Sequence, residues 1–201
     1  MGYYIRILGK RSESPPLEQL QRAAEPAVLD ADGGIEDKWE ALILKHETGE
    51  PIAFIEKNLV LPGQLGADEL QEFVSEVSHY KPTSAAAWLE KYLSSVKVIY
   101  SFQLLHGTEV DNGFEKMRRV YASLWGHAGG VLQADQEGFS NESGYTILWQ
   151  FSDDVSGAWG VGILLPNGRW VNFEMDLGNP QHREAFWRGD VPTGVKLISE
   201  Q

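Results

Sequence analysis

The sequence predicts an α+β fold, made mostly of antiparallel sheets with flanking helices. Three observations lead to this prediction. Short runs rich in β-branched and aromatic residues recur between turn residues. Stretches with apolar residues at helical spacing separate some of these runs. One pair of runs is joined by Pro166-Asn167-Gly168, and Asn-Gly between apolar runs is a strong hairpin signal.

The first half of the chain predicts a strand, a helix, a strand, a hairpin and two helices, in that order. We place these elements at residues 3–8, 17–26, 28–31, 39–45 with 51–56, 68–77 and 83–96. Ser14-Pro15 resembles a serine cap followed by proline at the first helical position. A turn is expected at 32–34, and Thr83 or Ser84 is expected to cap the last helix.

The second half opens with a strand at 98–105 and the clearest helix, at 112–125. Asn112 followed by Glu115 resembles a capping box, and the helix should bury its apolar stripe against the second-half strands. Further strands are predicted at 131–134, 145–151, 159–165 and 170–177, with a short helix from Asn179-Pro180 to Gly189. The apolar residues of the tail, 191–201, suit an edge strand.

An internal echo suggests a duplication. Residues 28–32 read VLDAD and residues 131–135 read VLQAD, with four identities in five positions. The order strand, helix, strand, hairpin and helix also recurs. We therefore predict a tandem duplication with a first half at 1–96 and a second at 97–201. The alternative is a single irregular α+β domain.

Composition excludes several classes of site. The 201 residues include no Cys, which rules out disulfides, zinc–thiolate sites and Cys nucleophiles. A net charge of -12 would repel a phosphate backbone, so no nucleic acid partner is expected. The longest apolar run, 157–165, is too short to span a membrane, and the start lacks the apolar run of a signal peptide. We expect a cytoplasmic protein without membrane contact.

Carboxylates gather in two turns of the second half, Asp135 with Glu137 and Asp153 with Asp154. Trp159 lies nearby in a segment rich in tryptophan, and aromatic rings beside carboxylates are typical of recognition surfaces. These five residues are the candidate binding residues. The spacing of a calcium loop is missing, so no metal is expected, and solvated turns are the simpler interpretation.

Alternation along 170–177 places Glu174 and Asp176 on one face of a strand. With His182 close in sequence, these two carboxylates could act as a general acid and base, and Arg183 could anchor an anion. The competing interpretation is a strand with one wet face and one dry face. No histidine pair has metal-ligand spacing and no glycine-rich loop suits a phosphate, so no cofactor is expected.

The stretch GGVLQADQEGFSNESG at 129–144, followed by ILWQFSDDVSG at 147–157, resembles a family of uncharacterised bacterial proteins of unknown function. The resemblance runs through most of the chain and implies no active residues. The small acidic α+β form is also similar, in size and composition alone, to immunity proteins of bacterial toxin systems.

The leading functional hypothesis is a non-catalytic cytoplasmic binding protein whose acidic surface recognises a protein partner of basic charge, such as a toxin. One alternative is a hydrolase or metal-assisted enzyme that uses Glu174, Asp176 and His182. Another is a small-ligand sensor with a pocket between the halves. A concave pocket that joins Glu174 and His182 would favour the enzyme, and an acidic face with exposed aromatic rings would favour the binding protein. The acidity could also serve solubility alone.

Overall fold

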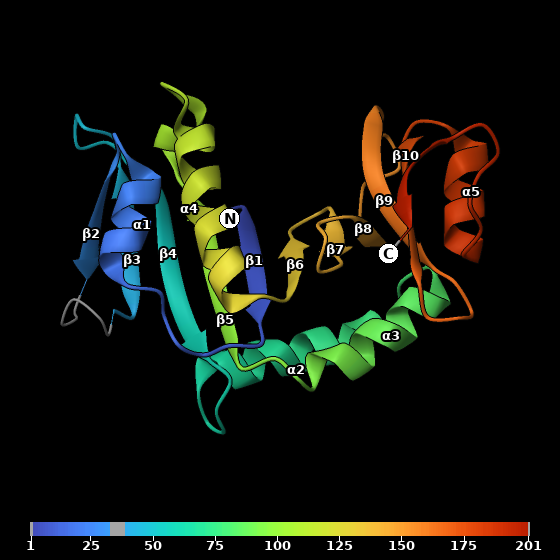
Figure 1. Ribbon diagram of the computed structural model, residues 1–201, viewed down its shortest axis with the longest axis horizontal. Helices are drawn as coiled ribbons and strands as arrows, with labels where there is room; N and C mark the ends of the chain where they lie inside the picture. The colour runs from blue at the N-terminus through green and yellow to red at the C-terminus, as the bar shows by residue number, and fades with distance from the viewer. Residues whose placement is uncertain (1, 33–38, 201) are drawn as a thin grey trace. The chain divides into compact units, whose positions relative to one another are not determined.

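The computed structural model describes residues 2–32 and 39–200 (Figure 1). Helices and mostly antiparallel strands follow one another along the chain, which confirms the α+β class. The chain divides into two compact units: unit 1, Met1–Asp68 with Val96–Gly130, and unit 2, Glu69–Ser95 with Val131–Gln201. Both units are discontinuous in sequence. The predicted halves, 1–96 and 97–201, follow the order of elements instead and stay a prediction.

Unit 1 is an antiparallel sheet with two helices. Its elements are β1 (Tyr4–Gly9), α1 (Leu17–Ala24), β2 (Val28–Asp32), β3 (Ala41–Lys45), β4 (Pro51–Leu59), β5 (Val98–Leu104), the 3-10 helix η1 (His106–Glu109) and α4 (Gly113–Ala128). The strands lie in the order β1-β5-β4-β3-β2, and each pairs antiparallel with its neighbour. The predicted hairpin of β3 and β4 is confirmed, with Ile43 opposite Phe54.

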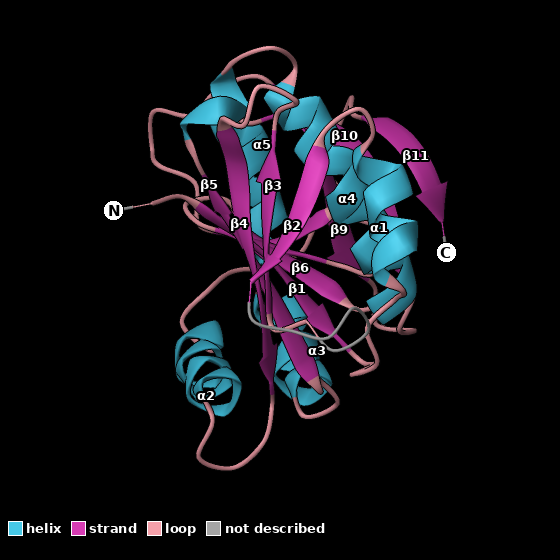
Figure 2. Cartoon of the chain, turned by 90° about the vertical axis from the view of Figure 1, so that its left-hand side faces the viewer, coloured by secondary structure: helices cyan, strands magenta, loops and turns pink. Residues whose placement is uncertain are grey.

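The helices α1 and α4 lie side by side over the sheet of unit 1 (Figures 1 and 2). Alternation explains which residues they cover, because Leu42 and Leu44 of β3 are fully buried while their neighbours are half-buried. Leu124 of α4 is also fully buried. The main partners of α4 are α1, η1, β1 and β4, and its Tyr121 ring meets Phe102 of β5 edge-on. The predicted packing against second-half strands is therefore seen at β5, whereas β1 and β4 belong to the first half.

Unit 2 holds α3 (Thr83–Leu93), β6 (Val131–Ala134), β7 (Gly138–Ser140), β8 (Thr146–Trp149), β9 (Ala158–Leu164), β10 (Trp170–Asp176), α5 (Pro180–Arg188) and β11 (Lys196–Glu200). The helix α2 (Leu65–Val77) begins in unit 1 and continues into unit 2. The strands of unit 2 follow one another in chain order from β6 to β11. The pairing of β8 with β9 is parallel, and the other recorded pairings in this unit are antiparallel.

The core of unit 2 lies between the strands β8 to β10 and the helix α5. Trp149, Phe173 and Phe186 are buried there, and Trp159 and Trp187 pack against them. Local signals predicted this region well: the β9–β10 hairpin, the edge strand β11 and the limits of α5 are all confirmed. The side chain of Asn179 accepts hydrogen bonds from the second and third helical residues, as a helix cap does.

Other helix caps differ from the prediction. Pro16 precedes α1 and Pro82 precedes α3, and neither position has a side-chain cap. Asn112 does precede α4, but its left-handed backbone, with φ 59°, gives no side-chain cap bond. Glu115, the other expected member of the capping box, accepts hydrogen bonds from the guanidinium of Arg118. The strand β7 was not predicted. The turn predicted at 32–34 lies largely outside the described residues.

Candidate functional site

Arg183 organises the acidic segment that follows β8. Its guanidinium donates to the carbonyl oxygens of Asp153 and Val155, both at 2.6 Å, and to that of Leu177. The same group lies 5.5 Å from the centre of the Trp149 ring. One rigid planar cation therefore fixes the backbone on both sides of Asp154. Its donors are used on carbonyl groups, and this differs from the role of anion anchor considered above.

The carboxylates of this segment are exposed. Asp153 and Asp154 both face solvent, and Ser152 donates its hydroxyl hydrogen to Asp154 at 2.6 Å. That hydrogen bond is the main cause that lowers the pKa of Asp154, and the charge of Arg183 lowers it further. Two adjacent carboxylates are thus presented on a fixed loop, and the lowered pKa of Asp154 keeps that carboxylate ionised.

Asp176 belongs to the same loop cluster. Its carboxylate accepts the backbone N–H of Gly178 at 2.8 Å and of Gly157 at 3.2 Å, and these bonds lower its pKa. The structure therefore brings Asp176 together with the 153–154 segment, since Gly157 ends that loop. Nδ1 of His182 accepts the backbone N–H of Asp176 at 3.3 Å. Glu174 is exposed one pleat away on β10.

The side chains of Asp176 and His182 hold the local backbone through hydrogen bonds, and this competes with a role in acid–base chemistry. Asp176, one of the two carboxylates considered as a general acid or base, uses Oδ1 to accept backbone N–H groups. His182, the histidine close to it in sequence, uses Nδ1 in the same way. A general base needs its acceptor directed at a substrate proton.

The remaining predicted residues lie elsewhere in unit 2. Asp135 and Glu137 are half-buried in the turn between β6 and β7. Trp159 is half-buried on β9, where its indole N–H donates to the Thr146 hydroxyl at 2.9 Å and its ring meets Phe151 edge-on. Trp159 therefore supports the core of unit 2 with both its ring and its polar atom.

Unit 1 contains a cavity that the sequence did not indicate. Its volume is about 450 Å³, and it lies where the end of β4 meets the first turn of α2. The lining residues are Trp39, Glu40, Lys57, Asn58, Leu59, Gln64, Leu65 and Gly66. Gly66 permits this close approach, because a Cβ atom there would stand 2.6 Å from the carbonyl oxygen of Leu59.

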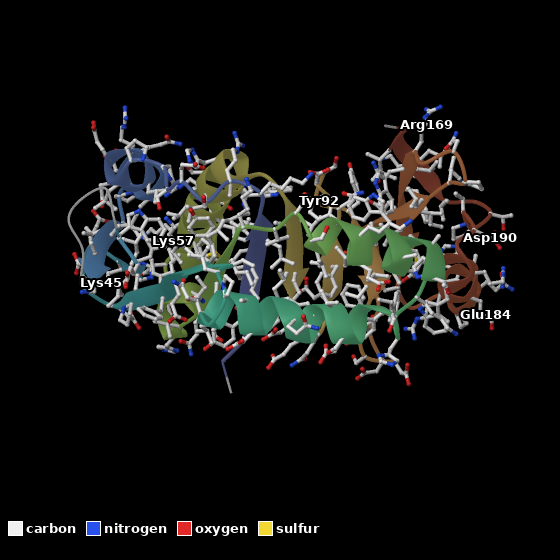
Figure 3. All side chains as sticks on the ribbon, turned by 90° about the horizontal axis from the view of Figure 1, so that it is seen from below. Lys45, Lys57, Tyr92, Arg169, Glu184 and Asp190 are labelled. Atoms are coloured by element: carbon white, nitrogen blue, oxygen red, sulfur yellow. The ribbon has the colours of Figure 1, made fainter. Side chains whose placement is uncertain are left out.

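Lys57 is the cation of this cavity and is labelled in Figure 3. Its ammonium group donates to the Ser14 hydroxyl at 2.7 Å. Partial burial lowers its pKa, and the nearby carboxylates of Glu13 and Glu40 act in the opposite direction. Glu40 also accepts, through its backbone carbonyl, the N–H of Lys57 at 2.8 Å. Lys57 and Glu40 thus both line the cavity, one as a cation and one as an exposed carboxylate.

Two buried polar atoms adjoin this region. Over residues 2–32 and 39–200, the buried side-chain atoms without a hydrogen-bond partner are Trp39 Nε1 and the Tyr100 hydroxyl. The two rings lie 5.7 Å apart. Burial raises the pKa of Tyr100, and the nearby Ser14 hydroxyl lowers it by a smaller amount. The two hydroxyl groups do not form a hydrogen bond of good geometry. An unsatisfied buried polar atom is costly, and both of these atoms adjoin the cavity region.

Sequence reasoning missed this cavity because its residues carry no motif. One signal was present: Ile55, Lys57 and Leu59 alternate along β4, which puts a lysine on an otherwise apolar face. Among the described residues, no group of three or more His, Asp or Glu side chains is placed to hold a metal ion. Nor does any helix in the described ranges combine the length and apolar character needed to cross a bilayer.

Comparison with known proteins gives no match to a family model, to a curated protein or to a solved structure.

Proposed function

We propose that the protein is a non-catalytic cytoplasmic binding protein that recognises a basic protein partner through the acidic surface of unit 2, as an immunity protein would. The observation that carries this proposal is the three-carbonyl clamp of Arg183, which holds exposed Asp153 and Asp154 on a fixed backbone. Fixing the loop before binding reduces the entropy that association would otherwise cost.

Charge around the clamp supports the same proposal. Asp176 joins the loop through Gly157, and its lowered pKa keeps it ionised. On α5 and just beyond it, Glu184 and Asp190 are also exposed and point outward in Figure 3. A basic partner would gain from these charges in its association rate and in its orientation.

Comparative affinity capture tests the proposal. Wild-type protein would be immobilised beside a variant with Asp153→Lys and Asp154→Lys, and beside a control with Glu47→Lys and Glu109→Lys. The control residues are exposed in unit 1, so both variants change the net charge equally. We expect wild type and control to retain a basic protein at low salt that the loop variant does not retain. Equal retention by all three would contradict the proposal.

The enzyme alternative has less support, because Asp176 and His182 Nδ1 accept backbone N–H groups. It predicts that Asp176→Asn abolishes a hydrolytic activity. The binding proposal predicts no such activity, and it expects Asp176→Asn to retain the partner with reduced affinity.

We also propose that the chain arose by tandem duplication. The first VL-x-AD segment follows α1 and the second follows α4, and each forms the first strand of an antiparallel three-strand run. Superposition of an isolated β2–β4 run on the β6–β8 run, in an experimental structure, tests this origin. Different strand registers at the matched pentapeptides would contradict it.

A further inference from the structure

We propose that the cavity of unit 1 binds a free apolar amino acid as its zwitterion. The ligand's carboxylate would meet the indole N–H of Trp39 and the ammonium of Lys57, its own ammonium would meet Glu40, and its side chain would cover Leu65. This site belongs to unit 1 and is separate from the acidic loop of unit 2.

The first argument is the unsatisfied donor. Trp39 lines the cavity with a side chain that is 1% exposed, and its Nε1 has no hydrogen-bond partner. Leaving a buried N–H unpaired is energetically costly. Because the atom is buried, a ligand acceptor in the cavity would meet it only once the indole ring turns toward the cavity. That contact would remove the cost, so the cavity would favour ligands that carry an acceptor.

The second argument is charge balance. Lys57 and Glu40 both line the cavity, and Glu13 stands near Lys57. A ligand with a carboxylate alone would be attracted to Lys57 but repelled by the carboxylates of Glu40 and Glu13. A ligand with an ammonium alone would find Glu40 but would leave the indole N–H unpaired. A molecule with both groups satisfies both sides of the cavity.

The third argument is the apolar wall. The ring of Trp39 and the side chain of Leu59 form part of the lining, and Leu65 lines it while being 63% exposed. Leu61, in the turn before α2, is another exposed leucine, at 47%. A branched aliphatic side chain would remove Leu65 from water. The volume of about 450 Å³ lies within the usual range for small-molecule sites.

Three probes with a common carbon skeleton test the proposal on the full chain. Leucine carries both charged groups, isocaproate lacks the ammonium and isoamylamine lacks the carboxylate. Each would be titrated into labelled protein while proton–nitrogen correlation spectra follow the indole N–H of Trp39, assigned by its loss in Trp39→Phe. We expect leucine to shift this signal saturably and to bind about tenfold more tightly than either analogue, as one charged hydrogen bond predicts.

Matched variants locate the contacts. Trp39→Phe keeps an aromatic wall and removes the donor, so leucine affinity should fall about tenfold. Trp125→Phe in the same unit, whose indole N–H donates to Gly130 and does not line the cavity, should retain it. Lys57→Met should also lose affinity, and Lys45→Met on the neighbouring strand should not.

Glu40 provides a test that does not depend on the buried residues. Its side chain is exposed, so Glu40→Gln should fold normally. We expect this variant to reduce the preference for leucine over isocaproate. The proposal is overturned if leucine produces no saturable shift, if either analogue binds as tightly as leucine, or if Glu40→Gln leaves the preference unchanged.

Discussion

Replacing Arg183 by methionine tests how the acidic loop is held. Methionine keeps an unbranched apolar side chain over Trp149 but removes every donor to the carbonyls of Asp153, Val155 and Leu177. The 152–157 segment would then keep its sequence and its charges while losing its clamp.

The size of the effect follows from the three hydrogen bonds. Bonds from a charged donor contribute about 1.5–3 kcal/mol each when buried. Those to Leu177 and Val155 are partly buried, and the bond to Asp153 is exposed and contributes less. The carbonyls can also turn to water once the arginine is gone. We therefore expect Arg183→Met to lower the free energy of unfolding by about 3 kcal/mol. The free energy of unfolding of Arg183→Lys should lie between those of wild type and Arg183→Met. A lysine keeps a charged donor, but its ammonium cannot bind three carbonyls at such spacing.

Urea unfolding followed by tryptophan fluorescence measures this loss. Arg188→Met is the matched control, since Arg188 lies on the same helix but pairs with exposed Asp190. The control should stay within about 0.5 kcal/mol of wild type. If Arg183→Met were no less stable than Arg188→Met, the clamp would not stabilise the loop and our account of unit 2 would be wrong.

Three further predictions follow. Leu124→Ala should cost about 2–5 kcal/mol in urea unfolding, because this leucine is fully buried on α4, and a cost below about 0.5 kcal/mol would show that the helix is not core. Gly162→Ala should cost about 1–3 kcal/mol, since the new Cβ would stand 2.9 Å from the amide oxygen of Asn172. Gly126→Ala, in a helix with no atom near the new Cβ, should instead stabilise by about 0.5–1 kcal/mol, and similar effects of the two changes would refute the packing argument. Asp176 has a lowered folded-state pKa, so its contribution to stability is present above the unfolded-state pKa and is lost as pH falls through the folded value; a carboxyl titration by NMR that placed its midpoint at or above the ordinary value would contradict this.

Local signals predicted much of the fold. Asn167-Gly168 set the β9–β10 hairpin, and Asn179 with Gly189 set the ends of α5, because each device acts within a few residues of chain. The strand β7 was missed because three residues beginning with glycine give no apolar run. The capping box at Asn112 failed because its left-handed backbone gives no side-chain cap bond.

The candidate sites were less predictable because they depend on contacts between distant residues. Asp153 and Asp154 were identified from the sequence, but the clamp was not, since two of its carbonyls lie 28 and 30 residues before Arg183. The cavity depends on the meeting of Trp39 with the ends of β4 and α2. No spacing rule joins those segments.

The most direct test of the proposed function is the association rate with the captured basic partner, measured at low and at physiological salt. We expect wild-type protein to associate more slowly as salt rises, and the Asp153→Lys, Asp154→Lys variant to associate slowly at both. Stability should change little, because both residues are exposed. A rate indifferent both to salt and to the double reversal would contradict electrostatic recognition by the acidic loop.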